Sequence, residues 1–581
     1  MDALYARSKG HPLFLTELAQ QAAGGDLPAS LVDSVSARCD ELGAPSATLR
    51  TASVLGPELD LDLLAAVLGR PLVELLTDAE QGVAKQFLVE QDGQLRFRHE
   101  LLREALAASA TSGRAALLHR HAGRILASRP ASDPMVVAEH ARLGGDLELA
   151  AGALRDAAAR AAERFDHGAA ESLLDDALSL HPDPQTWLAR ARVRTRRGRY
   201  DDALADVERA GAAGPAGLEV GAWASYFGRH FAQAAQFAAD GALAAPDAAT
   251  RARCLAVGGR TWHAAGDLTQ AEQLLTEALA IAEGADRVTA AAWLGVLRSH
   301  QSRMDEALTL LRPAARGQIG VEHTSATLHA LLFTGHARAL AGNAAAALSA
   351  FSQYTAEVER RQVPRFAGRA VNFAGWVLRN LGATRQAVDL HQEALDVGRH
   401  HGTAEVTVAA LEDLAEARLE ADDPDGAQAL LIEAAGLLDG DVVFGWRLAF
   451  KHQLLTARRF LLLGEAEQAR SAAGALAASA TALRVPRYAS VARLTGHLAG
   501  RMLDLPADPA AIEADLDLLD RSAALEAWHW TGEIGAAFAH PGWLARADER
   551  ARRLAASAGE YGGELQHAAS ARLALWQQAG G

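Results

Sequence analysis

The sequence predicts an all-α fold, an α-solenoid of stacked helical hairpins. Alanine and leucine dominate a chain of 581 residues of which only 5% are aromatic, and this composition favours helix over sheet. A glycine followed five residues later by an alanine also recurs along the chain. The clearest pairs are Gly198/Ala203, Gly266/Ala271, Gly342/Ala347, Gly382/Ala387 and Gly464/Ala469.

Each glycine–alanine pair has a physical meaning. Glycine readily adopts the left-handed conformation that ends a helix, and an alanine inside the next helix lets two backbones approach closely. Degenerate copies fill the longer gaps, at Phe231/Ala234, Ser302/Ala307 and Asp422/Ala427. The repeat unit is then about 31 to 42 residues long, close to the roughly 34 residues of tetratricopeptide repeats. Such units bury their apolar faces by stacking into a superhelix with a concave binding surface.

The first 130 residues or so follow a different pattern. We expect helices over residues 13–23, 27–42, 47–55, 61–68 and 72–84. The segments 87–90 and 95–98 then flank Asp92-Gly93, a dipeptide suited to a tight hairpin turn, and helix resumes at His99. Three helices followed by a β-hairpin indicate a winged-helix domain.

Several motifs in this part of the chain carry a resemblance to a known family. They are Gly10-His11-Pro12-Leu13-Phe14-Leu15-Thr16-Glu17-Leu18, Leu27-Pro28 leading to Ser36-Ala37-Arg38, Phe97-Arg98-His99-Glu100-Leu101-Leu102-Arg103-Glu104-Ala105, and Leu118-His119. Over about residues 1–180 the sequence resembles the large ATP-binding LuxR-type transcriptional regulators. These belong to the STAND class, the signal-transduction ATPases with numerous domains.

The resemblance implies a domain order and candidate nucleotide contacts. The family places a P-loop ATPase domain, a helical lid, a winged helix, a tetratricopeptide-like sensor array and often a DNA-binding helix-turn-helix in that order. Gly10 and Pro12 match the lid motif that lies against the nucleotide base. His99 takes the place of the histidine that senses the β-phosphate in related switches. We therefore expect a lid remnant over 1–43, a winged helix over 44–112, repeats over 113–500 and C-terminal helical repeats with a cap over 501–581.

The chain departs from this family in two ways. It contains no GxxxxGK[ST] motif, so ATP hydrolysis is not expected, and ATP or ADP would bind only if a P-loop module were supplied elsewhere. The last 80 or so residues do not resemble a DNA-reading helix-turn-helix, and part of this tail is acidic, with Asp515, Asp517, Asp520 and Glu526. The sequence thus has the regulatory parts of such a switch without its ATPase.

Composition and motifs exclude several classes of function. A formal net charge of −15 argues against nucleic acid as the main ligand. No apolar stretch reaches membrane-spanning length, and the first residues lack a signal-peptide core, so we expect a cytoplasmic location and no membrane partner. Cys39 and Cys254 have no metal-ligand spacing, and no catalytic motif is present. We predict neither a metal site nor an enzyme.

The sequence offers a few candidate partner-binding residues. Six arginines lie within ten residues, and we expect them on a solvated helix face, paired with Asp201, Asp202 and Asp206. Among them, Arg190, Arg194 and Arg197 are candidates for binding an acidic partner, and Trp223 and Trp262 are candidates for lining the groove. The many carboxylates of the array are also expected on its solvated face.

Three functions remain open. In the first, the chain is the non-catalytic sensor of a STAND-type regulator, whose array binds an inducer, a peptide or a protein and signals to a separate ATPase or DNA-binding module. In the second, it is a stand-alone scaffold that grips a partner protein. In the third, the winged helix binds DNA directly, although the wing carries Glu90 and Asp92 and no basic residue.

Overall fold

The computed structural model describes residues 29–211, 214–317, 320, 323–438, 440 and 442–579. Its contacts divide the chain into two compact units, one ending at Val193 and the other beginning at Arg194. Each unit has hydrophobic clusters of its own. Among the described residues, no helix is long and apolar enough to cross a membrane.

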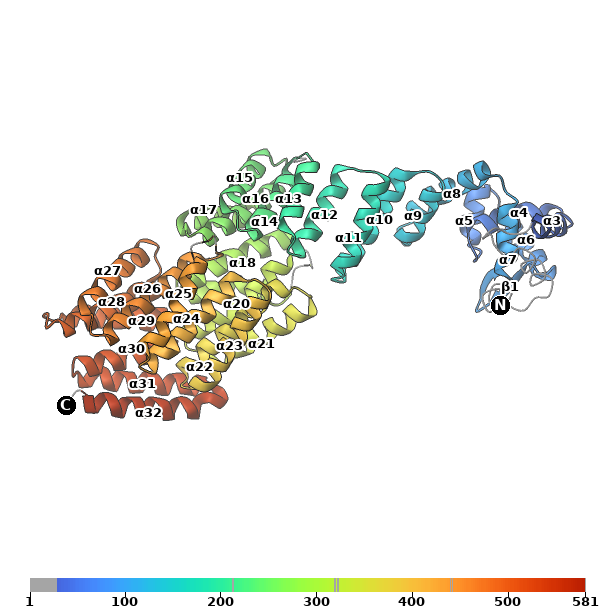
Figure 1. Cartoon of the computed structure of the whole chain (residues 1–581). Helices are drawn as coiled ribbons and strands as arrows, with labels where there is room; N and C mark the ends of the chain where they lie inside the picture. The colour runs from blue at the N-terminus through green and yellow to red at the C-terminus, as the bar shows by residue number, and fades with distance from the viewer. Residues whose placement is uncertain are drawn as a thin grey trace. The chain divides into compact units, whose positions relative to one another are not determined.

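The first unit begins with a small helical domain that carries one β-hairpin, followed by helical pairs (Figure 1). Its elements are α3 (Ala29–Asp40), α4 (Ala44–Leu55), α5 (Leu61–Leu68), α6 (Leu72–Ala84), β1 (Leu88–Gln91), β2 (Gln94–Phe97), α7 (Glu100–Ala108), α8 (Ser112–Ala127), α9 (Pro134–Leu143), α10 (Leu147–Glu163), α11 (His167–Leu180) and most of α12 (Pro184–Arg196). The predicted helices 61–68 and 72–84 have these bounds. The predicted helix 13–23 lies outside the described residues.

The predicted hairpin is present. Leu88 pairs with Phe97 in an antiparallel ladder, and Asp92 and Gly93 both have positive φ, 55° and 75°, as a two-residue type I′ turn requires. Helix α3 shares the core of this domain, since Leu31 lies in one cluster with Phe87 and with residues of α4, α6 and α7. The described part of the predicted lid therefore packs with the helices that follow it.

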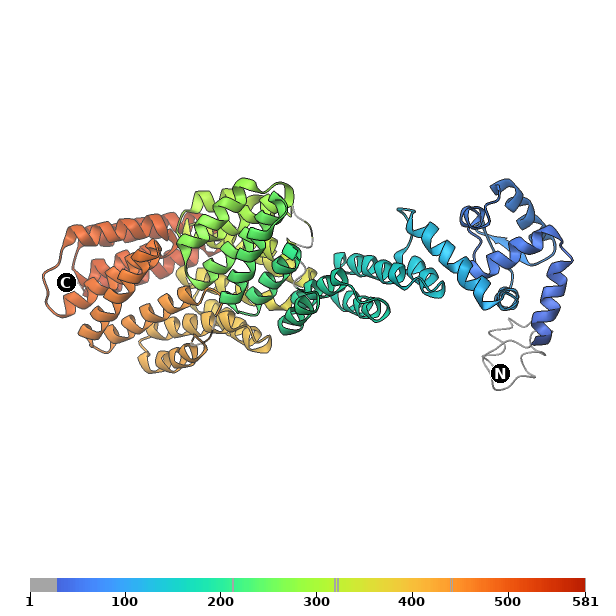
Figure 2. The same ribbon diagram turned by 90° about the horizontal axis from the view of Figure 1, so that it is seen from above.

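The second unit is a continuous stack of antiparallel helix pairs (Figure 2). Its helices are α13 (Tyr200–Arg209), α14 (Gly214–Phe227), α15 (Phe231–Ala244), α16 (Ala248–Ala265), α17 (Leu268–Ile281), α18 (Gly284–His300), α19 (Met304–Ala315), α20 (Thr324–Leu340), α21 (Ala344–Arg360), η2 (Pro364–Phe366), α22 (Arg369–Asn380), α23 (Thr384–His400), α24 (Ala404–Glu420), α25 (Pro424–Leu438), α26 (Gly445–Leu462), α27 (Ala466–Ala482), α28 (Pro486–Met502), α29 (Pro509–Ser522), α30 (Ala524–Ala537), α31 (Pro541–Ser557), η3 (Gly559–Tyr561) and α32 (Gly562–Ala579). The all-α solenoid is confirmed.

The glycine–alanine pattern marks the turns between paired helices. All five predicted glycines have positive φ, between 78° and 100°, and the five alanines that follow them are fully buried. Ser302 and Asp422 adopt the same conformation, each with φ of 58°. The copy expected at Phe231 differs, because the left-handed residue is Arg229, five positions before the buried Ala234. A single strained non-glycine residue can thus fill the turn position when the alanine is kept.

Helices near the end of the second unit contact helices that come much earlier in it. In an open solenoid each repeat touches only its neighbours. Here α16 contacts α26, α20 and α22 contact α30, and α21 contacts α31. Trp446 donates its indole N–H to the carbonyl oxygen of His263, with 3.0 Å between the two atoms, and Ser557 bonds the carbonyl oxygen of Gly342. The C-terminal helices therefore cover the inner face of the earlier repeats.

Candidate ligand-binding site inside the superhelix

Two adjoining cavities lie in the second unit where the returning helices meet the earlier repeats. The larger has a volume of about 80 Å³ and the smaller about 40 Å³. Lys451, Arg487 and Tyr488 belong to the walls of both. Most of the lining comes from the first helices of consecutive pairs, namely α20, α22, α24, α26, α28 and α30. Each of these helices turns one face inward, so residues far apart in the sequence share the site.

Aromatic rings form one side of the larger cavity. Phe333 of α20 and Phe373 and Trp376 of α22 line it, together with Phe444 from the turn before α26. The ring centroids of Phe333 and Phe444 lie 6.4 Å apart in an edge-to-face arrangement. Phe444 has φ of 59°, a conformation that bulky residues rarely adopt, so packing of its ring holds a strained backbone in place.

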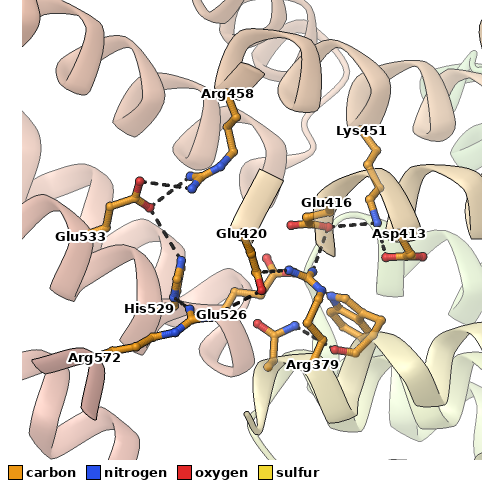
Figure 3. Close-up of polar contacts among 12 residues, drawn as sticks. Arg379, Asp413, Glu416, Glu420, Lys451, Arg458, Glu526, His529, Glu533 and Arg572 are labelled. Carbon is orange, nitrogen blue, oxygen red and sulfur yellow. Dashed lines mark hydrogen bonds and ion pairs between the residues drawn. The ribbon is translucent and has the colours of Figure 1, made fainter. Parts of the chain in front are cut away.

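The smaller cavity is lined by a network of partly buried ion pairs (Figure 3). Arg379 of α22 binds two carboxylates of α24, with 2.8 Å to Glu416 and 2.7 Å to Glu420. Lys451 of α26 pairs with Glu416 at 3.2 Å and also with Asp413. Charge-assisted hydrogen bonds thereby join α22, α24 and α26, the first helices of three successive pairs.

The network continues to the C-terminal helices. Arg458 of α26 binds both oxygens of Glu533 on α30, each at 3.1 Å. Arg572 of α32 contacts Glu420 at 3.4 Å and donates to Nδ1 of His529. Burial, with the nearby charge of Arg572, lowers the pKa of His529 to about 3, so the ring is neutral and accepts this bond.

Glu412 differs from every carboxylate of this network. It is fully buried on α24 and lines the larger cavity, yet neither of its oxygens has a hydrogen-bond partner among the described residues. Nδ1 of His452 lies 4.0 Å away, beyond hydrogen-bonding distance. Burial raises the pKa of Glu412 well above its usual value, although the charges of Lys451 and Arg447 act in the opposite direction.

The adjacent Asp413 is also buried, but its carboxylate has hydrogen-bond partners. Its oxygens accept hydrogen bonds from Asn372, at 2.7 Å, and from Lys451. Burial alone would raise the pKa of Asp413, but the charges of Lys451, His391 and Arg379 outweigh burial and lower it. Two consecutive acids of one helix therefore have opposite pKa shifts, and only Glu412 lacks a counter-charge.

Beyond the aromatic side of the cavity lies a cluster of buried histidines. His263 and His300 share a hydrogen bond of 2.9 Å between Nε2 and Nδ1, and Nδ1 of His336 lies 2.7 Å from the hydroxyl of Ser299. Burial lowers the pKa of all three rings, and that of His329, well below the usual value. These imidazoles are therefore neutral members of the core. Among the described residues, no three His, Cys, Asp or Glu side chains are arranged to hold a metal ion.

The predicted arginine cluster lies in and around α12, at the boundary of the two units. The expectation that it faces solvent is wrong for Arg190 and Arg194, which are 8% and 9% exposed. Arg190 binds Asp175 at 2.5 Å and Arg194 binds Asp206 at 2.8 Å, so the expected pairing with Asp206 is confirmed. The reason is that α12 is an interior repeat helix, whose arginines reach acids on the helices before and after it. Arg197 is exposed.

The remaining predicted site residues also lie away from the cavities. Trp223 stacks on Phe227, with 5.7 Å between ring centroids, and is half-buried, whereas Trp262 is 36% exposed. His99 is the N-cap residue of α7 in the first unit. The other two nucleotide-contact candidates, Gly10 and Pro12, lie outside the described residues.

The charged residues that line the cavities were not predicted from the sequence, because the carboxylates of a helical array are usually on its solvated face. A signal was present in their spacing. Asp413, Glu416 and Glu420 recur at intervals of three and four residues, as do Glu526, His529 and Glu533, and each set therefore shares one helix face. Acids on a solvated helix face have the same spacing, so this signal identifies a shared helix face and not its burial.

Comparison with protein-family models gives no match, and a search of curated proteins gives no significant match. Two of the solved structures with a similar arrangement of helices are as follows. One is a STAND protein with a tetratricopeptide repeat sensor from Pyrococcus horikoshii, at 14% identity and a TM-score of 0.27, covering 91% of this chain and 69% of that protein. The other is a Rap protein in complex with competence and sporulation factor, at 11% identity and a TM-score of 0.35, covering 66% and 99%. With scores this low, neither likeness adds to what the helices of this chain themselves show.

Proposed function

We propose that this chain is the non-catalytic sensor portion of a STAND-type regulator and that its superhelix binds a small effector in the larger cavity. Glu412 carries the proposal. An unpaired carboxyl group buried in protein is costly, and such a cost is retained where a ligand supplies the missing partner. The cavity of about 80 Å³ suits a small molecule better than an extended peptide.

Closure of the superhelix gives such an effector a way to act. Its cavity is bounded by helices of the earlier repeats and by α26 and α28, which belong to the returning half. An effector that contacts both sets stabilises the closed arrangement over any more open one. A ligand shifts an equilibrium only by its difference in affinity for the two states, so contacts on both sides are what a sensor needs.

In this proposal the first unit relays the state of the array. The helices α4, α5 and α6 with the β1–β2 hairpin serve as the winged-helix relay. Gly10, Pro12 and His99 meet a nucleotide only when a P-loop module is supplied by another part of the protein or by a partner. Direct DNA binding is disfavoured because the tip of the hairpin, residues 90–94, carries Glu90 and Asp92 and no basic residue.

A scaffold that holds a partner protein is the second candidate. Its support is a row of apolar side chains on the outer face of α6, where Leu72, Val73 and Leu76 are 45%, 75% and 44% exposed. In that role the partner would bind the first unit, and the cavity of the second unit would have no function.

A thermal-shift screen of the full chain against a library of small metabolites tests the proposed function. Ala409 lines the cavity, so Ala409→Phe fills it, and Ala475→Phe adds the same ring on the exposed side of α27 as a control. At least one compound is expected to raise the melting temperature of the wild type and of Ala475→Phe but not of Ala409→Phe. Ala409→Leu serves if the larger ring prevents folding. A library in which no compound distinguishes these variants contradicts the proposal.

A further inference from the structure

Among the charged residues that line the larger cavity, one acid and one base have no ion-pair partner of opposite charge. The matched pairs are Arg369 with Glu405, Lys451 with Asp413, and Arg487 with Glu526. Glu412 has no hydrogen-bond partner, and among the described residues no ion pair is formed by the guanidinium of Arg447. Both residues line the cavity. The imbalance is thus one potential anion and one cation in the lining of the same cavity.

Glu412 and Arg447 come from packed helices, yet they do not pair with each other. Glu412 lies on α24 and Arg447 on α26, and these helices are in contact. Both side chains line the cavity, and among the described residues no ion pair joins them. A molecule between them with an ammonium group and a carboxylate group would satisfy both, through two charge-assisted hydrogen bonds.

The rest of the cavity restricts the size and polarity of that molecule. Its volume of about 80 Å³ is roughly half that of an engineered cavity that holds benzene, so the occupant is small. Phe373 and Phe444 add an apolar surface to the lining of the cavity. Phe373 also lies under the guanidinium of Arg447, at 5.8 Å, which keeps this side chain beside the cavity.

We propose that the effector of the larger cavity is a free amino acid with a small side chain, whose ammonium group binds Glu412 and whose carboxylate binds Arg447. This inference rests on the proposed function, because it names the chemistry of the same site. In this proposal Glu412 selects ligands with an ammonium group, and Arg447 selects ligands with a carboxylate. The aromatic wall receives the side chain.

Calorimetric titration of the full chain with glycine, L-alanine, L-valine and L-leucine tests this proposal. Two matched series separate the charges: ethylamine and propanoate for alanine, and 2-methylpropylamine and 3-methylbutanoate for valine. At least one of the four amino acids is expected to bind, with the matched amine and acid weaker by about tenfold or more. Glu412→Gln and Arg447→Gln should each weaken binding of the amino acid by about tenfold or more.

Two control measurements distinguish a loss of binding from a loss of folding. Glu412→Gln removes a buried acid without changing its shape, so its melting temperature should equal or exceed that of the wild type. Arg399→Gln removes an exposed arginine that does not line the cavity and should leave binding unchanged. A matched amine or acid that binds as tightly as its amino acid overturns the inference, as does binding that neither cavity substitution weakens.

The titration and the thermal-shift screen together distinguish a failure of this inference from a failure of the proposed function on which it rests. If none of the four amino acids binds, while another compound raises the melting temperature of the wild type and not of Ala409→Phe, the inference fails and the sensor proposal stands. If no compound at all distinguishes Ala409→Phe from the wild type, both fail.

Discussion

Trp376 donates its indole N–H to the carboxylate of Glu526, with 2.8 Å between Nε1 and Oε1, although the two residues are 150 positions apart in the chain. Arg487 binds the same carboxylate, with 2.9 Å from Nε to the other oxygen. One carboxylate of α30 therefore joins α22 and α28. Such bonds turn a one-dimensional stack of repeats into a closed structure with an interior.

Replacing Glu526 with alanine should destabilise the second unit. The change leaves the indole N–H of Trp376 without its acceptor and the buried guanidinium of Arg487 without its counter-charge. Breaking one side of a buried ion pair costs about 3–5 kcal/mol, and we expect a loss of stability of this order. The melting temperature of the full chain measures it. Glu467→Ala, on the exposed face of α27, should change the melting temperature little, and equal effects of the two substitutions would contradict this role for Glu526.

Gly382 and Gly464 form a matched pair that tests the docking of α32. Both have positive φ, 82° and 78°, so alanine at either position strains the backbone by roughly 1–2 kcal/mol. A Cβ at Gly382 would also collide with Ala568 of α32, whereas a Cβ at Gly464 meets nothing within 4 Å. Gly382→Ala should therefore lower the melting temperature more than Gly464→Ala and increase hydrogen exchange in α32. Equal effects would mean that α32 does not pack on this turn.

The buried histidines predict a loss of stability in mild acid. His263, His300 and His336 have folded-state pKa values well below the unfolded value of about 6.5, because burial and nearby arginines disfavour their charged forms. Below about pH 6.5 the unfolded chain binds protons that the folded chain does not, so stability is full above that pH and falls as pH decreases. Melting temperatures between pH 8 and pH 5 measure the effect.

Two substitutions distinguish the contribution of buried histidines to this pH dependence from that of exposed ones. His300→Asn should flatten the pH dependence, since one of the protons taken up on unfolding is no longer available. His400→Asn removes an exposed ring and should leave the dependence as it is. A melting temperature that stays constant from pH 8 to pH 5 would show that the interior histidines are not neutral.

Local features of the repeat were predictable from the sequence. A left-handed turn and a close helix approach each depend on one or two residues, so Gly266 with Ala271 indicated the hairpin without knowledge of its neighbours. The same holds for the Asp92-Gly93 turn. Arg229 was missed because any residue can be forced into the left-handed conformation when the surrounding packing is strong enough, and no composition rule marks such a residue.

The closure and the cavity could not be predicted in the same way. Contacts such as that between Trp528 and the carbonyl oxygen of Asn380 depend on the accumulated rotation of several repeats. Glu412 and Glu416 are indistinguishable in sequence from acids on a solvated helix. Only the position of α26 beside α24 shows that Glu416 is paired by Lys451 and that the oxygens of Glu412 have no hydrogen-bond partner among the described residues.

Helices far apart in the sequence close the superhelix around its cavity, and disulfide trapping is a direct test of this closure. A Cβ at Gly342 would lie 3.4 Å from the Cβ of Ala524, near the separation found in disulfides. Under mild oxidation Gly342→Cys/Ala524→Cys should form an intramolecular disulfide between residues of α30 and of the turn after α20, found by peptide mapping. The pair Gly342→Cys/Ala475→Cys should not. A failure of the first pair to cross-link in folded protein, or equal cross-linking of both pairs, would contradict the closed superhelix.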